Sequence, residues 1–214
     1  MPEKITKNEN IKREDREFRQ FVNFEIRAKD EDENKELWVE GYAATFNSPT
    51  VLWEYDGIEY KEQIDDRAFD EADMSDVIFN YNHSGKVMAR TRNKTLQLST
   101  DSRGLYMRAR LDGTEEGRKL YEEIKGGYID RMSFSFTVKE SAYDSENHMR
   151  TIRKLKKLYD VSAVDIPAYN DTSISARSFF ELEREKERKA LDNAELRKKL
   201  AMRTKINLIG GKTK

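Results

Sequence analysis

The segment IDRMSFSFTV, residues 129–138, has a hydroxyl side chain at every second position from Ser133 to Thr137. Side chains alternate between the two faces of a strand, so Ser133, Ser135 and Thr137 share one face and the intervening apolar residues share the other. The apolar face is expected to meet the core, which leaves the hydroxyl face toward solvent, a cleft or a partner. A serine nucleophile needs this placement, with a rigid backbone behind it and open space in front. Taken alone, the segment is more typical of an ordinary strand with serines on its solvent face.

The chain has two histidines that could act as the base of a serine hydrolase. Histidine is the usual base because it titrates near neutral pH. His83 follows the aromatic, strand-like segment VIFNYNH, whereas His148 lies in the polar segment YDSENHMR. A catalytic imidazole must be held in one orientation, which favours His83. A lone histidine more often has a structural or surface role, and that alternative stays open on these grounds.

The segment LYDVSAVDIPAYN offers two acids that could orient the imidazole, Asp160 and Asp165. Strand alternation places Asp160 on one face with Ser162, and Asp165 on the opposite face near the strand end. A carboxylate in the middle of a strand is costly to bury without a partner, which indicates a partner for Asp160. A charge on an edge strand is the equally good alternative.

Other chemistries have weaker support. The chain has neither HExxH nor closely paired histidines, and it lacks cysteine, so we expect neither a metal site nor a cysteine nucleophile. Gly126-Gly127 precedes a strand-like segment, whereas a phosphate-binding glycine loop must open into a helix. No cofactor is therefore expected.

Composition divides the 214 residues into three parts. Residues 1–20 are polar and charged and predict a flexible N-terminal arm. Residues 21–177 carry the apolar and alternating segments and predict one domain. Residues 178–214 are rich in Lys and Arg and predict a charged helical tail.

Net charge and composition limit the partners and the cellular compartment that we expect. The net charge of −1 does not indicate a nucleic-acid partner. The lack of cysteine suits a reducing compartment. No apolar stretch predicts a secretory signal or a membrane span.

Periodicity predicts a mainly β (α+β) body, a barrel or sandwich with a few helices. A pair of strands is expected at 21–28 and 37–47, followed by an edge strand or excursion at 50–63. A hairpin is expected at 95–101 and 104–111, and a last strand pair at 149–156 and 157–167. Single strands are expected at 77–83 and 129–138, and a loop at 140–148. Helices are expected at 65–76, at 114–125 and from 179 to about 205.

Short motifs follow one another in a definite order along this body. They are Ala68-Phe69, Asn82-His83, Leu96-Gln97-Leu98, Gly104-Leu105, Met132-Ser133-Phe134, Asp160-Val161-Ser162-Ala163-Val164 and Pro167-Ala168. The ordered set, which covers about residues 36–176, resembles the prohead (capsid maturation) serine protease family of tailed double-stranded DNA phages. That family is distantly related to the herpesvirus assemblin proteases.

The resemblance implies Ser133 as nucleophile, His83 as general base and Asp160 as third triad member. Glutamate is more usual at the third position, so the choice between Asp160 and Asp165 stays open. Ser135 stands where the family often has glycine, which makes it a rival nucleophile. The resemblance also implies a herpesvirus-protease-like fold, a closed β-barrel of about six to seven strands surrounded by a few helices. Backbone N–H groups near residues 168–171 are expected to form the oxyanion hole.

In function, the resemblance implies an endopeptidase that cleaves the scaffold, the major capsid protein or both, and itself. It would act in the host cytoplasm, inside the assembling prohead, with dimerisation left open. The tail is then either scaffold-like or removed by self-cleavage. The alternative is a catalytically inactive capsid assembly or scaffolding protein of protease ancestry. A small-molecule esterase is less favoured, because the chain lacks the GxSxG elbow.

Overall fold

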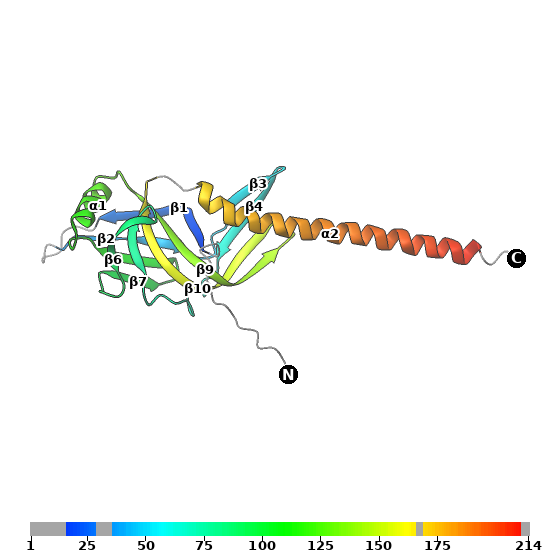
Figure 1. Cartoon of the computed structure of the whole chain (residues 1–214), viewed down its shortest axis with the longest axis horizontal. Helices are drawn as coiled ribbons and strands as arrows, with labels where there is room; N and C mark the ends of the chain where they lie inside the picture. The colour runs from blue at the N-terminus through cyan, green and yellow to red at the C-terminus, as the bar shows by residue number, and fades with distance from the viewer. Residues whose placement is uncertain (1–15, 29–35, 166–168, 211–214) are drawn as a thin grey trace, which may run out of the picture. The chain divides into compact units, whose positions relative to one another are not determined.

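The computed structural model of the chain describes residues 16–28, 36–165 and 169–210 (Figure 1). The chain divides into two compact units, Met1–Ser173 and Ile174–Lys214. In order, the elements are β1 (Glu17–Ala28), β2 (Trp38–Thr45), β3 (Thr50–Tyr55), β4 (Ile58–Ile64), β5 (Ile78–Tyr81), β6 (Ser84–Arg90), β7 (Leu96–Thr100), β8 (Gly104–Arg110), α1 (Glu115–Lys125), β9 (Arg131–Asp144), β10 (Met149–Val164) and α2 (Tyr169–Gly210).

The first unit is mainly β, as the sequence predicts. Ten of its strands form one sheet with the path β3-β4-β10-β9-β1-β2-β8-β7, and β5 joins β10 and β6 beside this path, within the described residues. The predicted β1–β2 and β7–β8 pairs are both antiparallel, with Ile26 opposite Gly41 and Leu98 opposite Met107. The β3–β4 hairpin lies at one end of the path, drawn in cyan in Figure 1.

Helix α1 begins and ends where its sequence predicts. The Thr114 side chain accepts a hydrogen bond from the backbone N–H of Gly117, and Gly126 follows the last turn. Leu120, Tyr121 and Ile124 are buried and belong to the same apolar core as residues of β2, β8, β9 and β10. Each large apolar side chain buried in this way stabilises the unit by roughly 1.5–3 kcal/mol.

Strand β10 corrects the prediction of a final strand pair. Residues 149–164 form one strand, which pairs antiparallel with β9 along its length and parallel with β4 and β5. Register shifts in its middle allow the charged stretch around Lys154 to remain in the ladder. Strand β9 also runs on to Asp144, so the predicted loop at 140–148 is reduced to a short turn.

The predicted helix at 65–76 is a series of turns. Some of its backbone groups close short turns, as where the N–H of Ala68 donates to the carbonyl of Asp65. Others bond to β10: the N–H of Leu155 donates to the carbonyl of Ala68, and the N–H of Asp73 donates to the carbonyl of Lys156. Pairing with a long neighbouring strand satisfies the same groups that a short helix would leave half-satisfied at its ends.

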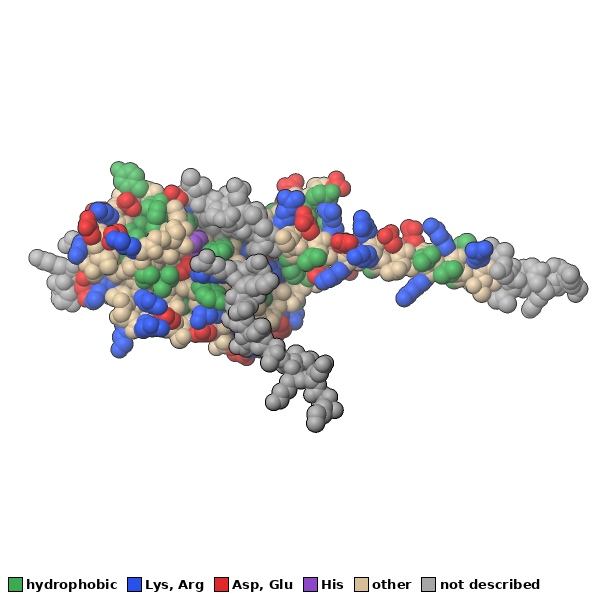
Figure 2. Space-filling model, viewed as in Figure 1, with side chains coloured by type: hydrophobic (Ala, Val, Ile, Leu, Met, Phe, Trp, Pro, Cys, Tyr) green, Lys and Arg blue, Asp and Glu red, His purple; other side chains and the backbone are tan. Residues whose placement is uncertain are grey.

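Two further differences concern the ends of the chain. Strand β1 begins at Glu17, within the stretch predicted as an arm, while residues 1–15 lie outside the described part. Helix α2 begins at Tyr169, ten residues before the predicted start at 179. Charged side chains of both signs follow one another along α2 (Figure 2). Among the described helices, none has a stretch apolar enough to cross a membrane.

Candidate active site

His83 lies in the turn between β5 and β6. Tyr81 pairs with Ser84, so the hairpin loop consists of Asn82 and His83 alone. Both residues have positive φ, 49° and 56°. A two-residue loop with positive φ at both positions matches the twist of the flanking strands. Strand β6 was not predicted, because neither loop residue is glycine, the residue that most often has positive φ in such a turn.

The turn is anchored to the end of β10. The Tyr81 hydroxyl donates to Asp165 Oδ2 at 2.6 Å, and Asn82 Nδ2 donates to Asp165 Oδ1 at 3.0 Å. The backbone N–H of Asn82 donates to the carbonyl of Ala163 at 3.0 Å. These bonds hold a strained pair of residues in place and thereby fix the direction of the His83 side chain.

Strand register brings the polar side chains of β9 and β10 to one face. Ser133 pairs with Ser162, and Ser135 pairs with Asp160. Directly paired residues of antiparallel strands point to the same side of a sheet. Asn80 of β5 pairs with Ser162 from the other edge of β10 and extends this polar face.

Three predicted residues meet on this face. The Nε2 atom of His83 lies 2.6 Å from Ser133 Oγ, and its Nδ1 atom lies 2.6 Å from Asp160 Oδ1. A carboxylate can only accept, so Nδ1 carries the proton and Nε2 is left to accept from the serine hydroxyl. This is the geometry of nucleophile, base and orienting acid.

Asp160 is buried but remains an anion. Burial raises the pKa of its carboxyl, and the His83 hydrogen bond and charge, together with bonds from Ser135 and Ser162, outweigh burial and lower it. Ser162 donates to Asp160 Oδ1 at 2.9 Å and lies 2.5 Å from Asn80 Oδ1. Strand alternation had placed Ser162 beside Asp160; the contribution of Asn80 carried no signal in the sequence.

The hydroxyl face of β9 is buried, contrary to the open space expected in front of it. Ser133 is 2% exposed and Ser135 is 0% exposed. Residues 17–20 of β1 pair with β9 on this stretch, and Gln20 lies opposite Ser133. The serine is therefore within a covered site.

The remaining candidates lie elsewhere or have other partners. Ser135 donates to Asp160 and accepts from Arg16 at 2.6 Å. Asp165 anchors the turn. His148 lies in the β9–β10 turn, where its Nδ1 atom is 3.3 Å from the Tyr143 hydroxyl.

Two further predictions concern the oxyanion hole and a metal site. Of the predicted oxyanion-hole residues 168–171, Ala168 lies outside the described residues and the others begin α2. No group of three or more His, Cys, Asp or Glu side chains within the described residues is arranged to hold a metal ion.

Most of this chain matches a known protein family. The family model described as "Caudovirus prohead serine protease" matches residues 22–186. A search of curated proteins gave no match. Among solved structures, the capsid assembly protease gp21 of bacteriophage T4 aligns with a TM-score of 0.43 at 17% identity, covering 70% of this chain and 95% of that one.

Proposed function

Because this chain belongs to the caudovirus prohead serine protease family, we propose that it is a serine endopeptidase acting in phage head maturation, with Ser133 as nucleophile, His83 as general base and Asp160 as the orienting acid. One observation carries the assignment. A single imidazole lies 2.6 Å from a serine hydroxyl on one side and 2.6 Å from a buried aspartate on the other.

The chemistry proceeds in two steps. Ser133 Oγ attacks the carbonyl carbon of the scissile bond while its proton passes to His83 Nε2. The C–N bond then breaks, and the same proton goes to the leaving amine, which leaves an acyl-serine. In the second step His83 takes a proton from water, the hydroxide attacks the ester, and Ser133 recovers its proton as the acid product leaves.

Asp160 has two tasks in this scheme. It fixes the tautomer with the proton on Nδ1, and its negative charge stabilises the imidazolium that forms in each step. Its low pKa supports both tasks, because the carboxylate stays ionised through the neutral range. Backbone N–H groups near residues 168–171 remain our proposal for stabilising the oxyanion.

We infer further properties from the family. The substrates would be the scaffold and the major capsid protein, inside the assembling prohead in the host cytoplasm, with self-cleavage in addition. Closure of the sheet into a barrel of about six to seven strands and dimerisation are expectations of the same kind. The predicted 21–177 body would be the protease domain, extended at its start by residues 17–20 of β1, and residues 178–214 would be a scaffold-like tail or a segment removed by self-cleavage.

The test is Ser133→Ala in the full chain. The parent should trim itself and cleave peptides, and the variant should do neither, with a loss of about 10⁶-fold in rate. Mass spectrometry of the expressed chain gives the fragments, and a cut near residue 178 would identify the tail as removable. If the variant yields the same fragments as the parent, Ser133 is not the nucleophile, and Ser135→Ala becomes the decisive variant.

An inactive assembly protein of protease ancestry is the second candidate. The covered state of Ser133, 2% exposed, is the observation in its favour. The same experiment separates the two, because an inactive protein shows no Ser133-dependent fragments under any condition.

A further inference from the structure

Ser162 lies at the centre of a row of polar side chains that crosses three strands. It pairs with Ser133 of β9 on one side and with Asn80 of β5 on the other. Ser162 is fully buried, and Asn80 is 4% exposed. Buried polar groups need hydrogen-bond partners, so these two side chains must bond within the site. The two proposed catalytic steps use neither of them.

The Ser162 hydroxyl has three polar neighbours. Its Oγ atom lies 2.5 Å from Asn80 Oδ1, 2.9 Å from Asp160 Oδ1 and 3.2 Å from His83 Nδ1. A serine hydroxyl has one proton to donate and can accept two further hydrogen bonds. It can therefore donate to Asn80 or to Asp160, and not to both.

Charge decides which of the two takes the proton. Asp160 is an anion, and hydrogen bonds to a charged acceptor are roughly twice as strong as those between neutral groups. The Ser162 proton therefore goes to Asp160 Oδ1. His83 Nδ1 carries its own proton, so the Ser162 oxygen can accept a long hydrogen bond from it at 3.2 Å. One accepting position of Ser162 remains, and it faces Asn80.

The Asn80 amide can meet that position with a donor. A half-turn of the amide exchanges its Oδ1 and Nδ2 atoms, which changes the hydrogen bond and leaves the packing the same. With Nδ2 toward Ser162, Asn80 donates to Ser162 and Ser162 donates to Asp160. With Oδ1 there, the Ser162 oxygen would contact one of the two acceptors with no proton between them, which is costly in a buried site.

The two carboxylate oxygens of Asp160 have different partners. Oδ2 accepts from Ser135 and pairs with Arg16, whereas Oδ1 meets His83 Nδ1 at 2.6 Å. Bonds to Oδ2 alone would leave the plane of the carboxylate free to rotate. The Ser162 bond to Oδ1 fixes that plane, and misplacing a catalytic group by about 1 Å can cost about 100-fold in rate.

We propose that Ser162 and Asn80 are positioning residues of the triad. Asn80 directs the single Ser162 proton to Asp160, and Ser162 holds Oδ1 of that carboxylate toward His83. This inference rests on the proposed protease function. Both residues act through Asp160, and neither takes part in the bond changes at Ser133.

The first experiment changes Ser162 in the full chain and measures how fast a small fluorophosphonate labels Ser133. Ser162→Ala removes the hydroxyl without adding bulk and should slow labelling by between about tenfold and 100-fold, since a hydrogen bond to a charged group is lost. Ser162→Thr keeps the hydroxyl and should label close to the parent rate. Ser162→Val has the shape of threonine without the hydroxyl and should behave like Ser162→Ala.

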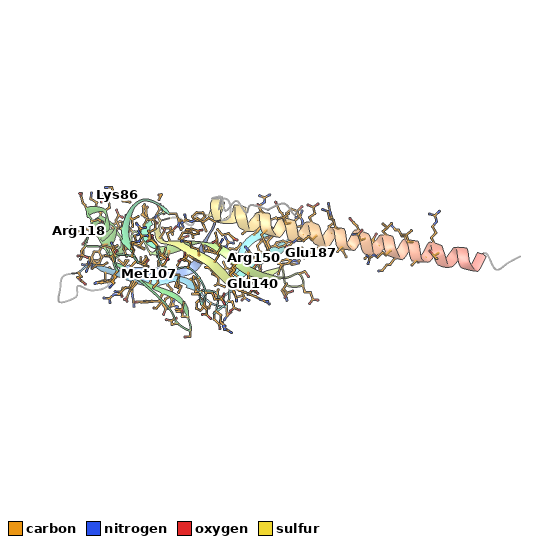
Figure 3. The ribbon with its side chains drawn as sticks, turned by 60° about the horizontal axis from the view of Figure 1, so that its bottom comes forward. Lys86, Met107, Arg118, Glu140, Arg150 and Glu187 are labelled. Carbon is orange, nitrogen blue, oxygen red and sulfur yellow. The ribbon has the colours of Figure 1, made fainter. Side chains whose placement is uncertain are left out.

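The matched control is Thr151→Val on the same strand. The Thr151 hydroxyl accepts from Gln63 Nε2 at 3.1 Å, at the end of β10 where Figure 3 labels Arg150. This change also removes a strand hydroxyl, but far from the triad. Ser133 should therefore be labelled at the parent rate.

A proton resonance gives a readout that a role in packing alone would not move. The Nδ1 proton of His83 lies in a hydrogen bond to a carboxylate, and its downfield signal is the one that disappears in His83→Ala. The signal should shift in Ser162→Ala, because Asp160 Oδ1 is then held by one bond fewer. It should keep its position in Ser162→Thr.

The second experiment tests the direction of the Asn80 bond. Asn80→Leu keeps the branched shape without polar atoms, and Asn80→Asp offers Ser162 an acceptor in place of a donor. Asn80→Asp should slow labelling more than Asn80→Leu, because it draws the Ser162 proton away from Asp160. The added negative charge would by itself favour the imidazolium, so charge alone predicts the opposite order. In the Ser162→Ala background, Asn80→Leu should cost nothing further.

The outcomes separate this inference from the proposed function. If the parent is labelled and Ser162→Ala matches it, or Ser162→Thr is as slow as Ser162→Val, the positioning role is wrong and the protease function stands. Equal labelling of Asn80→Leu and Asn80→Asp, or additive losses with Ser162→Ala, would remove Asn80 from the proposal. Absence of Ser133 labelling and of self-cleavage in the parent would overturn the protease function and the positioning role with it.

Discussion

The two histidines lie in similar backbone positions. His83 is in the β5–β6 turn and His148 in the β9–β10 turn, and both have positive φ, 56° and 49°. Their surroundings differ. The His83 nitrogens meet a buried carboxylate and a serine hydroxyl, each at 2.6 Å, whereas the His148 ring lies beside the Tyr60 ring with its Nδ1 atom 3.3 Å from the Tyr143 hydroxyl.

Position along the strands accounts for the difference. Ser133 lies near the start of β9 and His148 just past its end, a separation of about 35 Å for an extended strand. The start of β9 pairs with β1 on one side and β10 on the other, and its side chains Ser133 and Ser135 are buried there. A hairpin turn therefore presents a histidine at both places, and the buried strand face supplies the serine and the aspartate at only one.

The largest expected effect follows directly from this comparison. His83→Ala should be as inactive as Ser133→Ala, a loss of about 10⁶-fold, because triad members act as a unit. His148→Ala should retain most activity. Peptide hydrolysis by the three variants gives the result, and equal impairment by the two histidine changes would contradict the assignment.

Asp160→Asn should have the next largest effect. The amide keeps the shape but loses the charge and can hold the wrong tautomer, which costs about 10⁴-fold in kcat for a buried triad acid. Substrate binding should change little. A loss below about tenfold in kcat would show that Asp160 has no part in orienting His83.

Strand alternation was sufficient to predict part of this site. It placed Ser133 and Ser135 on one face of β9, and Asp160 with Ser162 on one face of β10, and the register of the two strands then brings these faces together. Alternation is a local property, so a single sequence reveals it.

Other features of the structure could not be predicted from strand alternation. Residues 16–20 resemble a solvated arm because they are charged, yet Glu17 and Arg19 pair inside the fold with Arg150 and Glu62, far away in sequence. The β5–β6 turn needs no glycine, because hydrogen bonds that Tyr81 and Asn82 donate to Asp165 offset the strain of its positive φ values. Both depend on long-range partners that local patterns do not encode.

The hydrogen bonds that Asp165 accepts lead to a prediction with an effect of intermediate size on kcat. Asp165→Asn weakens the anchor of the turn, so kcat should fall by between about tenfold and 100-fold through misplacement of His83. Tyr81→Phe removes one of the same bonds and serves as the matched variant. The two changes should be less than additive in the double variant. A loss as large as that of Asp160→Asn would instead make Asp165 the triad acid.

The smallest expected effect is on how the free energy of unfolding depends on pH. It compares Asp160, beside His83, with Asp144, at the end of β9. The pKa of Asp160 is lowered in a buried setting, because its bonds to His83 and the neighbouring serines outweigh burial; the pKa of the exposed Asp144 is lowered chiefly by the Asn147 side chain. A lowered carboxyl pKa stabilises the fold above the ordinary value near 4 and loses that contribution as pH falls through the folded value.

Asp160 is buried, so solvent hardly screens its bonds. If its pKa is one unit lower in the folded than in the unfolded chain, the free energy of unfolding at neutral pH is about 1.4 kcal/mol larger. Denaturant unfolding between pH 6 and 3 should therefore show a shallower fall in stability for Asp160→Asn than for the parent. Asp144→Asn should follow the parent curve closely, since solvent screens an exposed carboxylate. If the Asp160→Asn and parent curves run parallel, the carboxylate is not held ionised by its neighbours, and the electrostatic part of the assignment would have to be abandoned.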